Sequence, residues 1–101
     1  MEAFEFRAKV WLYPGEAAWH FITVPKGLSN EIKLEFGAMA RGWGSLPVKV
    51  QIGGSKWITS IFPDSKSNTY LLPVKSEIRK REKIVLGDNL QIGLMILTEK
   101  L

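Results

Sequence analysis

Apolar and polar residues alternate along the first part of the chain with the period of a half-buried β-strand. The alternation covers residues 4–13 and puts on one face Phe4, Phe6, Ala8, Val10 and Leu12. Pro14-Gly15 ends this segment, and residues 19–24 form a second predicted strand close enough to complete a hairpin. Pro25 closes that second strand, because proline cannot donate to a β-ladder.

The middle of the chain predicts a short helix and a second hairpin. Residues 29–37 begin with Ser29 as a candidate N-cap and end with Gly37 as a candidate C-cap, which is typical of a helix of about two turns. Residues 38–46 show no period, so we expect a loop or an irregular edge there. The strands predicted at 48–52 and 56–62 flank Gly53-Gly54, a two-residue connection that accepts the positive φ of a tight turn.

The last third of the chain predicts strand, helix and strand. Residues 63–68 read as an exposed polar loop, and residues 69–72 as a strand that Pro73 ends. A short basic helix is expected over residues 75–83, followed by a turn at Gly87-Asp88. The final strand covers residues 90–97, and its continuous apolar end indicates burial on both faces.

The two halves of the sequence repeat one order of elements. Each half has a strand ending at a proline, a second strand ending at another proline, a short helix and an apolar strand. The prolines that this comparison pairs are Pro14 with Pro63 and Pro25 with Pro73. A half of this size cannot bury its own sheet, so we expect pseudo-repeats of about 3–52 and 55–97 to share one core. The prediction is one mostly β domain over residues 1–101, a small barrel with an internal pseudo-two-fold repeat and one or two short helices.

Two sets of residues resemble known protein families. The first set resembles the strand, helix and Gly-Asp turn of the AbrB/MazE swapped-hairpin proteins, which are dimeric DNA-binding transcription factors and antitoxins. It consists of Leu72, Pro73, Lys75, Ile78, Arg79, Leu86, Gly87, Asp88, Leu90 and Ile92. In those proteins two identical basic halves bind DNA, whereas here only the second half is basic, so a symmetric DNA-reading face is not expected.

The whole chain more closely resembles the DUF1905 family. The matching residues are Phe6, Ala8, Trp19, Val24-Pro25, Arg41-Gly42-Trp43, Ile52-Gly53, Thr59-Ser60-Ile61-Phe62-Pro63, Tyr70-Leu71-Leu72-Pro73 and Gly87-Asp88. This resemblance implies a double-split β-barrel made by one chain instead of a swapped dimer. It implies no activity.

Composition narrows the range of functions. The 101 residues include no cysteine, which excludes disulfides and thiolate chemistry, and His20 is the one histidine. No apolar run reaches the roughly 18–20 residues of a membrane span, and the N-terminus lacks the pattern of a signal peptide. We therefore expect a cytoplasmic protein that is not an enzyme, holds no cofactor or metal, and does not associate with a membrane.

The formal net charge of +4 is concentrated in the predicted helix over 75–83, which holds five bases and two acids. With nearby aromatic residues, these bases predict a candidate nucleic-acid surface. Its candidate residues are Lys75, Arg79, Lys80, Lys83, Arg41, Trp43 and Trp57. The alternative is a solvated helix face with ordinary ion pairs such as Glu77 with Arg81, and tryptophans that pack in the core and rim. Trp43 lies between two glycines, so of the four tryptophans it is the one we most expect to be exposed.

Arg79 and Asp88 form a separate, structural prediction. A guanidinium on the helix and an acid on the following turn can pair across Gly87 and attach the helix to the barrel. The alternative is that Asp88 bonds to backbone amides of its own turn.

We interpret the chain as a non-enzymatic binding or interaction module whose ligand the sequence does not identify. The alternative is weak, sequence-independent nucleic-acid binding through residues 75–83 and the nearby aromatics. The partner is then a nucleic acid or another protein. A monomer is expected, with a dimer through an exposed edge strand as the alternative. A ligand inside the barrel is not expected, because side chains fill small barrels.

Overall fold

The computed structural model describes residues 3–15 and 18–97. Its strands are β1 (Ala3–Leu12), β2 (His20–Thr23), β3 (Leu46–Ile52), β4 (Ser55–Asp64), β5 (Thr69–Pro73) and β6 (Asn89–Ile96). Its helices are α1 (Lys26–Phe36) and α2 (Ser76–Arg81), with short 3₁₀ turns η1 (Gly37–Met39) and η2 (Gly42–Gly44) between α1 and β3. No helix in the described part of the chain is long and apolar enough to cross a bilayer.

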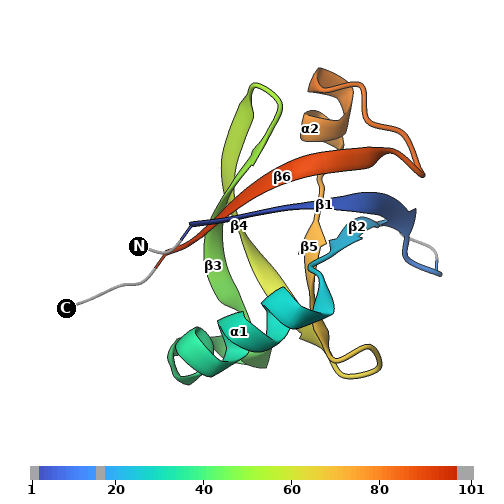
Figure 1. Ribbon diagram of the computed structural model, residues 1–101. Coiled ribbons are helices and arrows are strands. Elements are labelled where there is room, and N and C mark those ends of the chain that lie inside the picture. The colour runs from blue at the N-terminus through green and yellow to red at the C-terminus, as the bar shows by residue number, and fades with distance from the viewer. Residues whose placement is uncertain (1–2, 16–17, 98–101) are drawn as a thin grey trace.

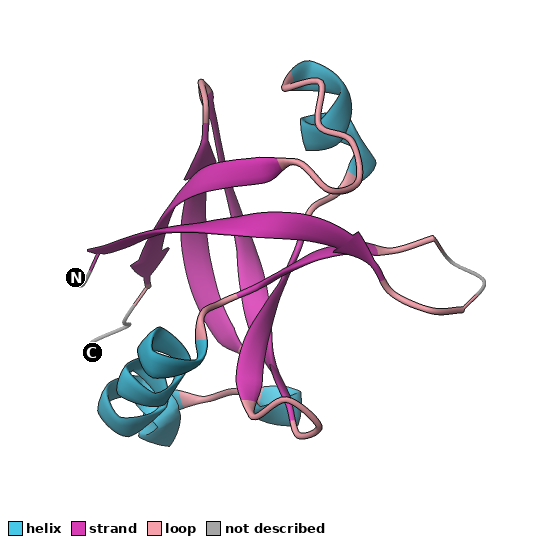
Figure 2. Cartoon of the chain, turned by 45° about the vertical axis from the view of Figure 1, so that its right-hand side comes forward, coloured by secondary structure: helices cyan, strands magenta, loops and turns pink. Residues whose placement is uncertain are grey.

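The six strands close into a barrel in the order β1-β2-β5-β4-β3-β6, and every pair is antiparallel (Figure 1). The two helices lie at opposite ends of this barrel (Figure 2). Apolar side chains from all the strands and both helices form one core, in which the most deeply buried include Ile22, Ile32, Val48, Ile61, Leu72, Ile78 and Ile92. The prediction of a small, mostly β barrel with two short helices is confirmed.

The connectivity of the barrel has an internal two-fold relation. Exchanging β1 with β4, β2 with β5 and β3 with β6 leaves the circular strand order unchanged. Val24 N–H donates to Tyr70 O at 2.9 Å, and Val74 N–H donates to His20 O at 3.0 Å. Adding 50 to residues 24 and 20 gives 74 and 70, so the two bonds occupy equivalent places at the ends of the β2–β5 ladder.

This relation corrects the pairing of prolines inferred from the sequence. Pro25 and Pro73 are 48 residues apart (73 − 25), so a shift of 50 does not superpose them, and the position equivalent to Pro73 is Thr23. Pro63 also does not end a strand, because β4 continues to Asp64 and Pro63 is in register with Tyr70. Strand and proline positions therefore repeat less regularly than the sequence suggests.

Pro73 lies at the point where the β4–β5 ladder stops. The bonds from Val24 N–H to Tyr70 O and from Val74 N–H to His20 O direct the backbone groups of residues 70 and 74 toward β2. Because backbone groups alternate in direction along a strand, those of residues 69, 71 and 73 face β4. Leu71 is in register with Phe62, but Pro73 has no N–H to continue the ladder. Pairing between β4 and β5 stops at Phe62 and Leu71, and the two strands separate.

Helix α1 begins earlier than predicted, and Ser29 is not its N-cap. The helix starts at Lys26 directly after Pro25, whose fixed φ of −51° precedes the first turn. Ser29 lies within the helix and is 2% exposed. Its Oγ donates to Val24 O and accepts from Tyr70 N–H, each at 3.0 Å. Ser29 therefore connects α1 to the ends of both β2 and β5.

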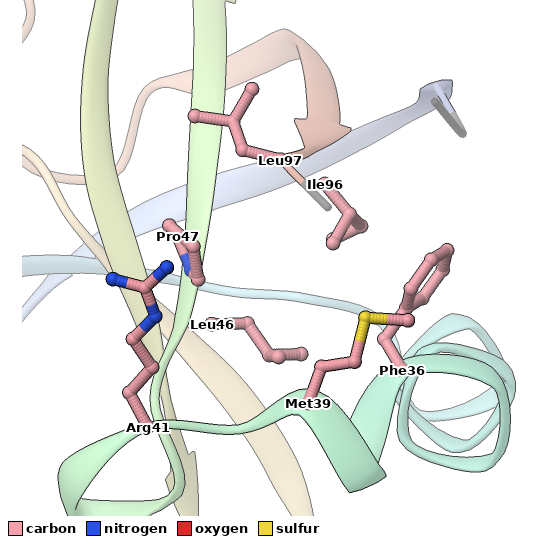
Figure 3. Close-up of a pocket in the computed structure, with 7 residues that line it drawn as sticks. All are labelled: Phe36, Met39, Arg41, Leu46, Pro47, Ile96 and Leu97. Atoms are coloured by element: carbon pink, nitrogen blue, oxygen red, sulfur yellow. The ribbon is translucent and has the colours of Figure 1, made fainter. Parts of the chain in front are cut away.

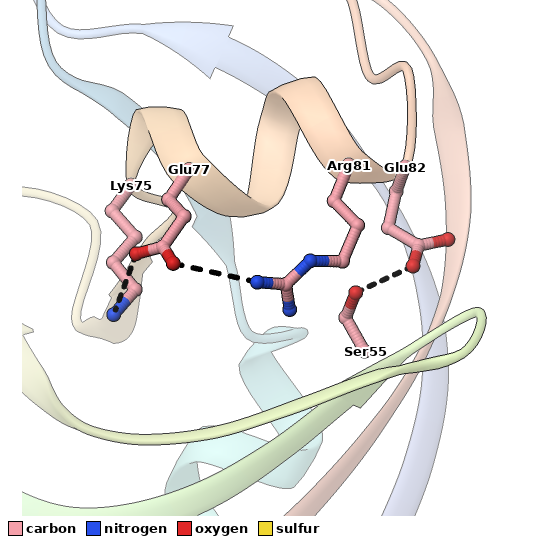
Figure 4. Close-up of polar contacts among 5 residues, drawn as sticks. All are labelled: Ser55, Lys75, Glu77, Arg81 and Glu82. Carbon is pink, nitrogen blue, oxygen red and sulfur yellow. Dashed lines mark hydrogen bonds and ion pairs between the residues drawn. The ribbon is translucent and has the colours of Figure 1, made fainter.

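The predicted Gly53-Gly54 hairpin is present, with Ile52 in register with Ser55. Gly53 has φ +58° and Gly54 does not have a positive φ, which is the pattern of a type II′ turn. The Ser55 hydroxyl donates to the Glu82 carboxylate at the end of α2 (Figure 4). A Cβ on Gly53 would clash with Glu82 Oε1, so this carboxylate occupies the space above the turn.

We expect Gly53→Ala to lower the free energy of unfolding by about 1–3 kcal/mol, because alanine disfavours positive φ and its methyl group displaces the Glu82 carboxylate. The measurement is urea denaturation. Gly54→Ala is the matched control, since nothing lies within 4 Å of a Cβ there; its effect should stay within about 0.5 kcal/mol. Equal effects of the two substitutions would contradict this account of the turn.

Ser29→Ala should also destabilise the protein, by about 1–3 kcal/mol, because it leaves the buried Tyr70 N–H without an acceptor. Thermal and urea unfolding would measure the change. The exposed Ser65→Ala serves as the control and should be neutral. A neutral Ser29→Ala would show that this hydroxyl does not connect α1 to β5 energetically.

Candidate functional site

A groove of about 980 Å³ opens where β4 and β5 separate. Its walls come from β2, β4, the end of β5, the beginning of α2 and the η2 turn. The residues used in the argument below are Tyr13, Trp19, Trp43, Trp57, Ile58, Phe62, Lys75 and Arg79. The groove is thus a direct consequence of the ladder that stops at Leu71.

The unequal lengths of the helices explain why this end of the barrel is hollow. Helix α1 has 11 residues and buries Ile32 and Phe36, whereas α2 has six residues and buries Ile78. The apolar volume that α2 supplies is therefore smaller. The end of the barrel beside α1 has a much smaller cavity, of about 220 Å³ (Figure 3).

One wall of the groove is aromatic. The ring of Phe21 on β2 lies 5.5 Å from the ring of Tyr13 and 6.0 Å from that of Trp19, both near edge-to-face. Such spacing is favourable for aromatic pairs. Trp19 is nevertheless 59% exposed. Tyr13, Trp19 and Phe62 were not predicted as site residues; the density of aromatic residues at the end of the first hairpin is a signal for Tyr13 and Trp19, whereas Phe62 lies on β4.

Trp43 stands at the rim of the groove and is 92% exposed, so the prediction of its exposure is confirmed. Its φ is +63°, a conformation that is uncommon for a tryptophan. The next residue, Gly44, also has a positive φ, and a Cβ there would lie 2.9 Å from Pro63 Cγ. Close packing of Gly44 on Pro63 therefore holds the turn that presents Trp43.

Two of the predicted cations reach the groove. Arg79 is half-buried, and its Nε donates to Val74 O at 3.1 Å, which fixes the guanidinium beside the end of β5. Lys75 Nζ lies 3.8 Å from Glu77, which also contacts Arg81 at 3.4 Å (Figure 4). These exposed ion pairs are weak and leave the lysine mobile enough to meet a ligand.

The other predicted bases lie elsewhere. Lys80 and Lys83 do not line the groove, and α2 ends at Arg81, so Lys83 lies beyond the helix with φ +55°. Arg41 lines the smaller cavity at the opposite end of the barrel, together with Phe36 and Met39 (Figure 3). The structure thus brings together Trp43, Trp57, Lys75 and Arg79, and it separates them from Arg41, Lys80 and Lys83.

The predicted pairing of Arg79 with Asp88 is wrong. Arg79 bonds to Val74 O, while Asp88 Oδ2 accepts from Val85 N–H at 2.9 Å. Asp88 N–H in turn donates to Val85 O at 3.1 Å. Gly87, with φ +87°, makes this turn tight enough to keep the carboxylate on its own loop. The alternative stated for Asp88 is therefore correct.

Two polar side chains around the groove contact residues close to them in the sequence. His20 Nδ1 lies 3.0 Å from Ala18 O, and Asp64 accepts from the Ser67 hydroxyl at 2.6 Å in its own turn. Burial raises the pKa of Tyr70, which lies in β5 but does not line the groove. Over residues 3–15 and 18–97, no three His, Asp or Glu side chains come together as metal ligands. What the groove presents is aromatic surface, strand backbone and two cations.

Comparison with known proteins identifies the family. The family model described as a domain of unknown function, DUF1905, matches residues 6–94. No curated protein matches the chain. The matched span runs from Phe6 in β1 to Leu94 in β6 and includes every residue that lines the groove. The chain therefore belongs to the DUF1905 family.

Proposed function

We propose that this domain is a non-catalytic binding module and that the groove between β4 and β5 is its binding site. One observation carries the proposal. Ten large apolar side chains of the described chain are exposed, and five of them line this groove. They are Tyr13, Trp19, Trp43, Ile58 and Phe62. A concentration of exposed apolar surface at one concave place is typical of interaction sites.

The chemistry of the walls supports the same function. Aromatic side chains give a large contact area with little loss of rotamer entropy, and they dominate the energetics of binding surfaces. Lys75 and Arg79 add positive charge at the α2 side of the groove. The groove therefore suits a ligand that has an apolar body and an anionic group.

A second candidate function is binding of single-stranded nucleic acid. Trp43 shares the groove with Lys75 and Arg79, which is the combination of stacking surface and cations that such binding uses, whereas Trp57 is only 9% exposed and packs in the core. With two phosphate contacts, the logarithm of the association constant falls against the logarithm of the salt concentration with a slope of only about −1.4. Binding of this kind is weak and independent of sequence.

The dye 1-anilinonaphthalene-8-sulfonate tests the groove, because it joins aromatic rings to a sulfonate. We expect the folded protein to bind it and Trp19→Ala with Trp43→Ala to weaken binding by about tenfold, through lost ring contacts. Leu34→Ala removes an equally exposed apolar side chain from α1 and is the control. Fluorescence titration measures both. If the tryptophan variant binds as the unaltered protein does, the groove is not the site.

Oligothymidylate of twelve nucleotides tests the second candidate by fluorescence anisotropy. Two phosphate contacts predict about sevenfold weaker binding at 200 mM than at 50 mM salt. Lys75→Ala with Arg79→Gln should abolish this dependence, whereas Lys80→Ala with Lys83→Ala should preserve it. The first pair lines the groove and the second does not. Loss in both variants would point to a diffuse charge effect, and absence of binding at 50 mM would exclude this candidate.

A further inference from the structure

One edge of β4 has no strand beside it along most of its length. Residues 55–61 pair with β3 on one side. On the other side the register with β5 covers Phe62, Pro63 and Asp64 alone. Within the described chain, therefore, no strand pairs with the β5-facing edge of residues 55–61. That edge lies at the groove, which Trp57, Ile58 and Thr59 line.

The direction of the backbone groups on this edge follows from Pro47. Pro47 is in register with Ser60 on β4, and its carbonyl accepts from Leu97 N–H at 2.9 Å beyond β6. Its backbone therefore faces away from β4, which makes Pro47 and Ser60 a non-hydrogen-bonded pair. By alternation, Lys56, Ile58 and Ser60 direct their N–H and C=O groups away from β3. The Ile58 side chain is 67% exposed, and this residue lies in the middle of the open edge.

The fold keeps this edge open. Pro73 has no N–H with which β5 could extend its ladder along β4, and the chain turns into α2 three residues later. An exposed row of backbone donors and acceptors is a template for another strand. Here the row is recessed in a groove with aromatic walls, which restricts what can pair with it.

We propose that the groove accepts an extended peptide of a partner protein, which adds to β4 as a strand centred on Ile58 and carries an acidic side chain for Lys75 and Arg79. This inference rests on the proposed function, since it names the occupant of the same groove. Main-chain bonds to an open strand edge give such complexes their affinity, and pockets for alternate side chains give specificity. Trp19, Trp43 and Phe62 supply surfaces for those side chains.

The charges favour an acidic peptide. Arg79 is held through Nε, and its two terminal nitrogens have no partner among the described residues, which suits them to a bidentate carboxylate. A peptide backbone also matches the alternating N–H and C=O groups of Lys56, Ile58 and Ser60, which a phosphodiester backbone does not. Three of the five bases at positions 75–83 lie away from the groove, so the positive charge there is too small for tight polyanion binding.

The experiment begins with selection of phage-displayed random dodecapeptides on the folded full chain. Selected peptides are synthesised and their affinities measured by calorimetry for the unaltered protein, Ile58→Pro and Ile58→Thr. Proline at position 58 removes the N–H that faces the groove but leaves every bond to β3 intact. Since its ring also prevents a peptide strand from pairing closely with β4, we expect Ile58→Pro to bind the peptide at least about tenfold more weakly. Ile58→Thr keeps the N–H and removes only part of the apolar side chain, so it measures the contribution of the side chain, and Ile58→Pro should bind more weakly than Ile58→Thr. Urea unfolding verifies that both variants fold.

Amide hydrogen exchange provides an independent readout. On adding the selected peptide, exchange of the Ile58 amide should slow. The Trp57 and Thr59 amides already face β3, so their exchange should change little, and they serve as internal controls. Selected sequences should be enriched in Asp and Glu, and Lys75→Ala with Arg79→Gln should remove that enrichment.

The outcomes separate this inference from the proposed function. Equal peptide affinity for Ile58→Pro and the unaltered protein overturns strand addition; if Trp19→Ala with Trp43→Ala still weakens binding, the groove remains the site. Peptide binding that neither set of variants changes overturns both proposals. Failure to select any peptide, with oligothymidylate binding present, overturns the peptide in favour of nucleic acid. If exchange of the Ile58 amide slows with rising protein concentration and not on adding peptide, a second copy of this chain is the occupant. That result overturns the proposal of a peptide from a partner protein.

Discussion

The β4–β5 ladder stops at Leu71, where the next residue that faces β4 is Pro73 and has no N–H to donate, and the candidate site is built around this stop. Beyond Leu71 the strands diverge, β4 keeps one pairing partner, and the space between them becomes the groove. At the equivalent position in the other half the residue is Thr23, which has its N–H, yet the β1–β2 ladder also covers only three residue pairs, so both halves of the barrel are split. The two halves differ in the helix that follows the split, since α1 has 11 residues and α2 has six.

The rest of the fold holds that opening in place. Glu82, at the end of α2, accepts from Ser55 at the base of the Gly53 turn, and Arg79 donates to Val74 O, so α2 is fastened to both sides of the separation. Ile78 anchors the same helix in the core. At the opposite end α1 is longer and Ser29 connects it to β2 and β5. A groove bounded by fixed elements loses little entropy when it binds a ligand.

The side chains that share the candidate site are not the ones that lie close together in the sequence. A helix over residues 75–83 would place Lys75, Arg79 and Lys83 on one face, but α2 covers only Ser76–Arg81, so Arg79 is the one of the three that lies in it. Trp43 was predicted to be exposed from its flanking glycines, and it reaches the groove because Gly44 packs on Pro63. Arg41, two residues before Trp43 in the sequence, lies at a different cavity. Proximity along the chain was therefore a poor guide to which side chains share a surface.

The alternation of apolar residues, the Gly53-Gly54 turn and the repeated order of elements were enough to determine a small mostly β barrel with two short helices, because these signals come from neighbouring residues. The chain alone did not determine that Ser29 bonds across the core, that Asp88 bonds to Val85 instead of Arg79, or that β4 has an open edge. Each of these depends on which distant backbone group lies opposite a given residue. Register between strands that are far apart in the sequence exists only after the barrel has closed, and so tertiary structure decided the site.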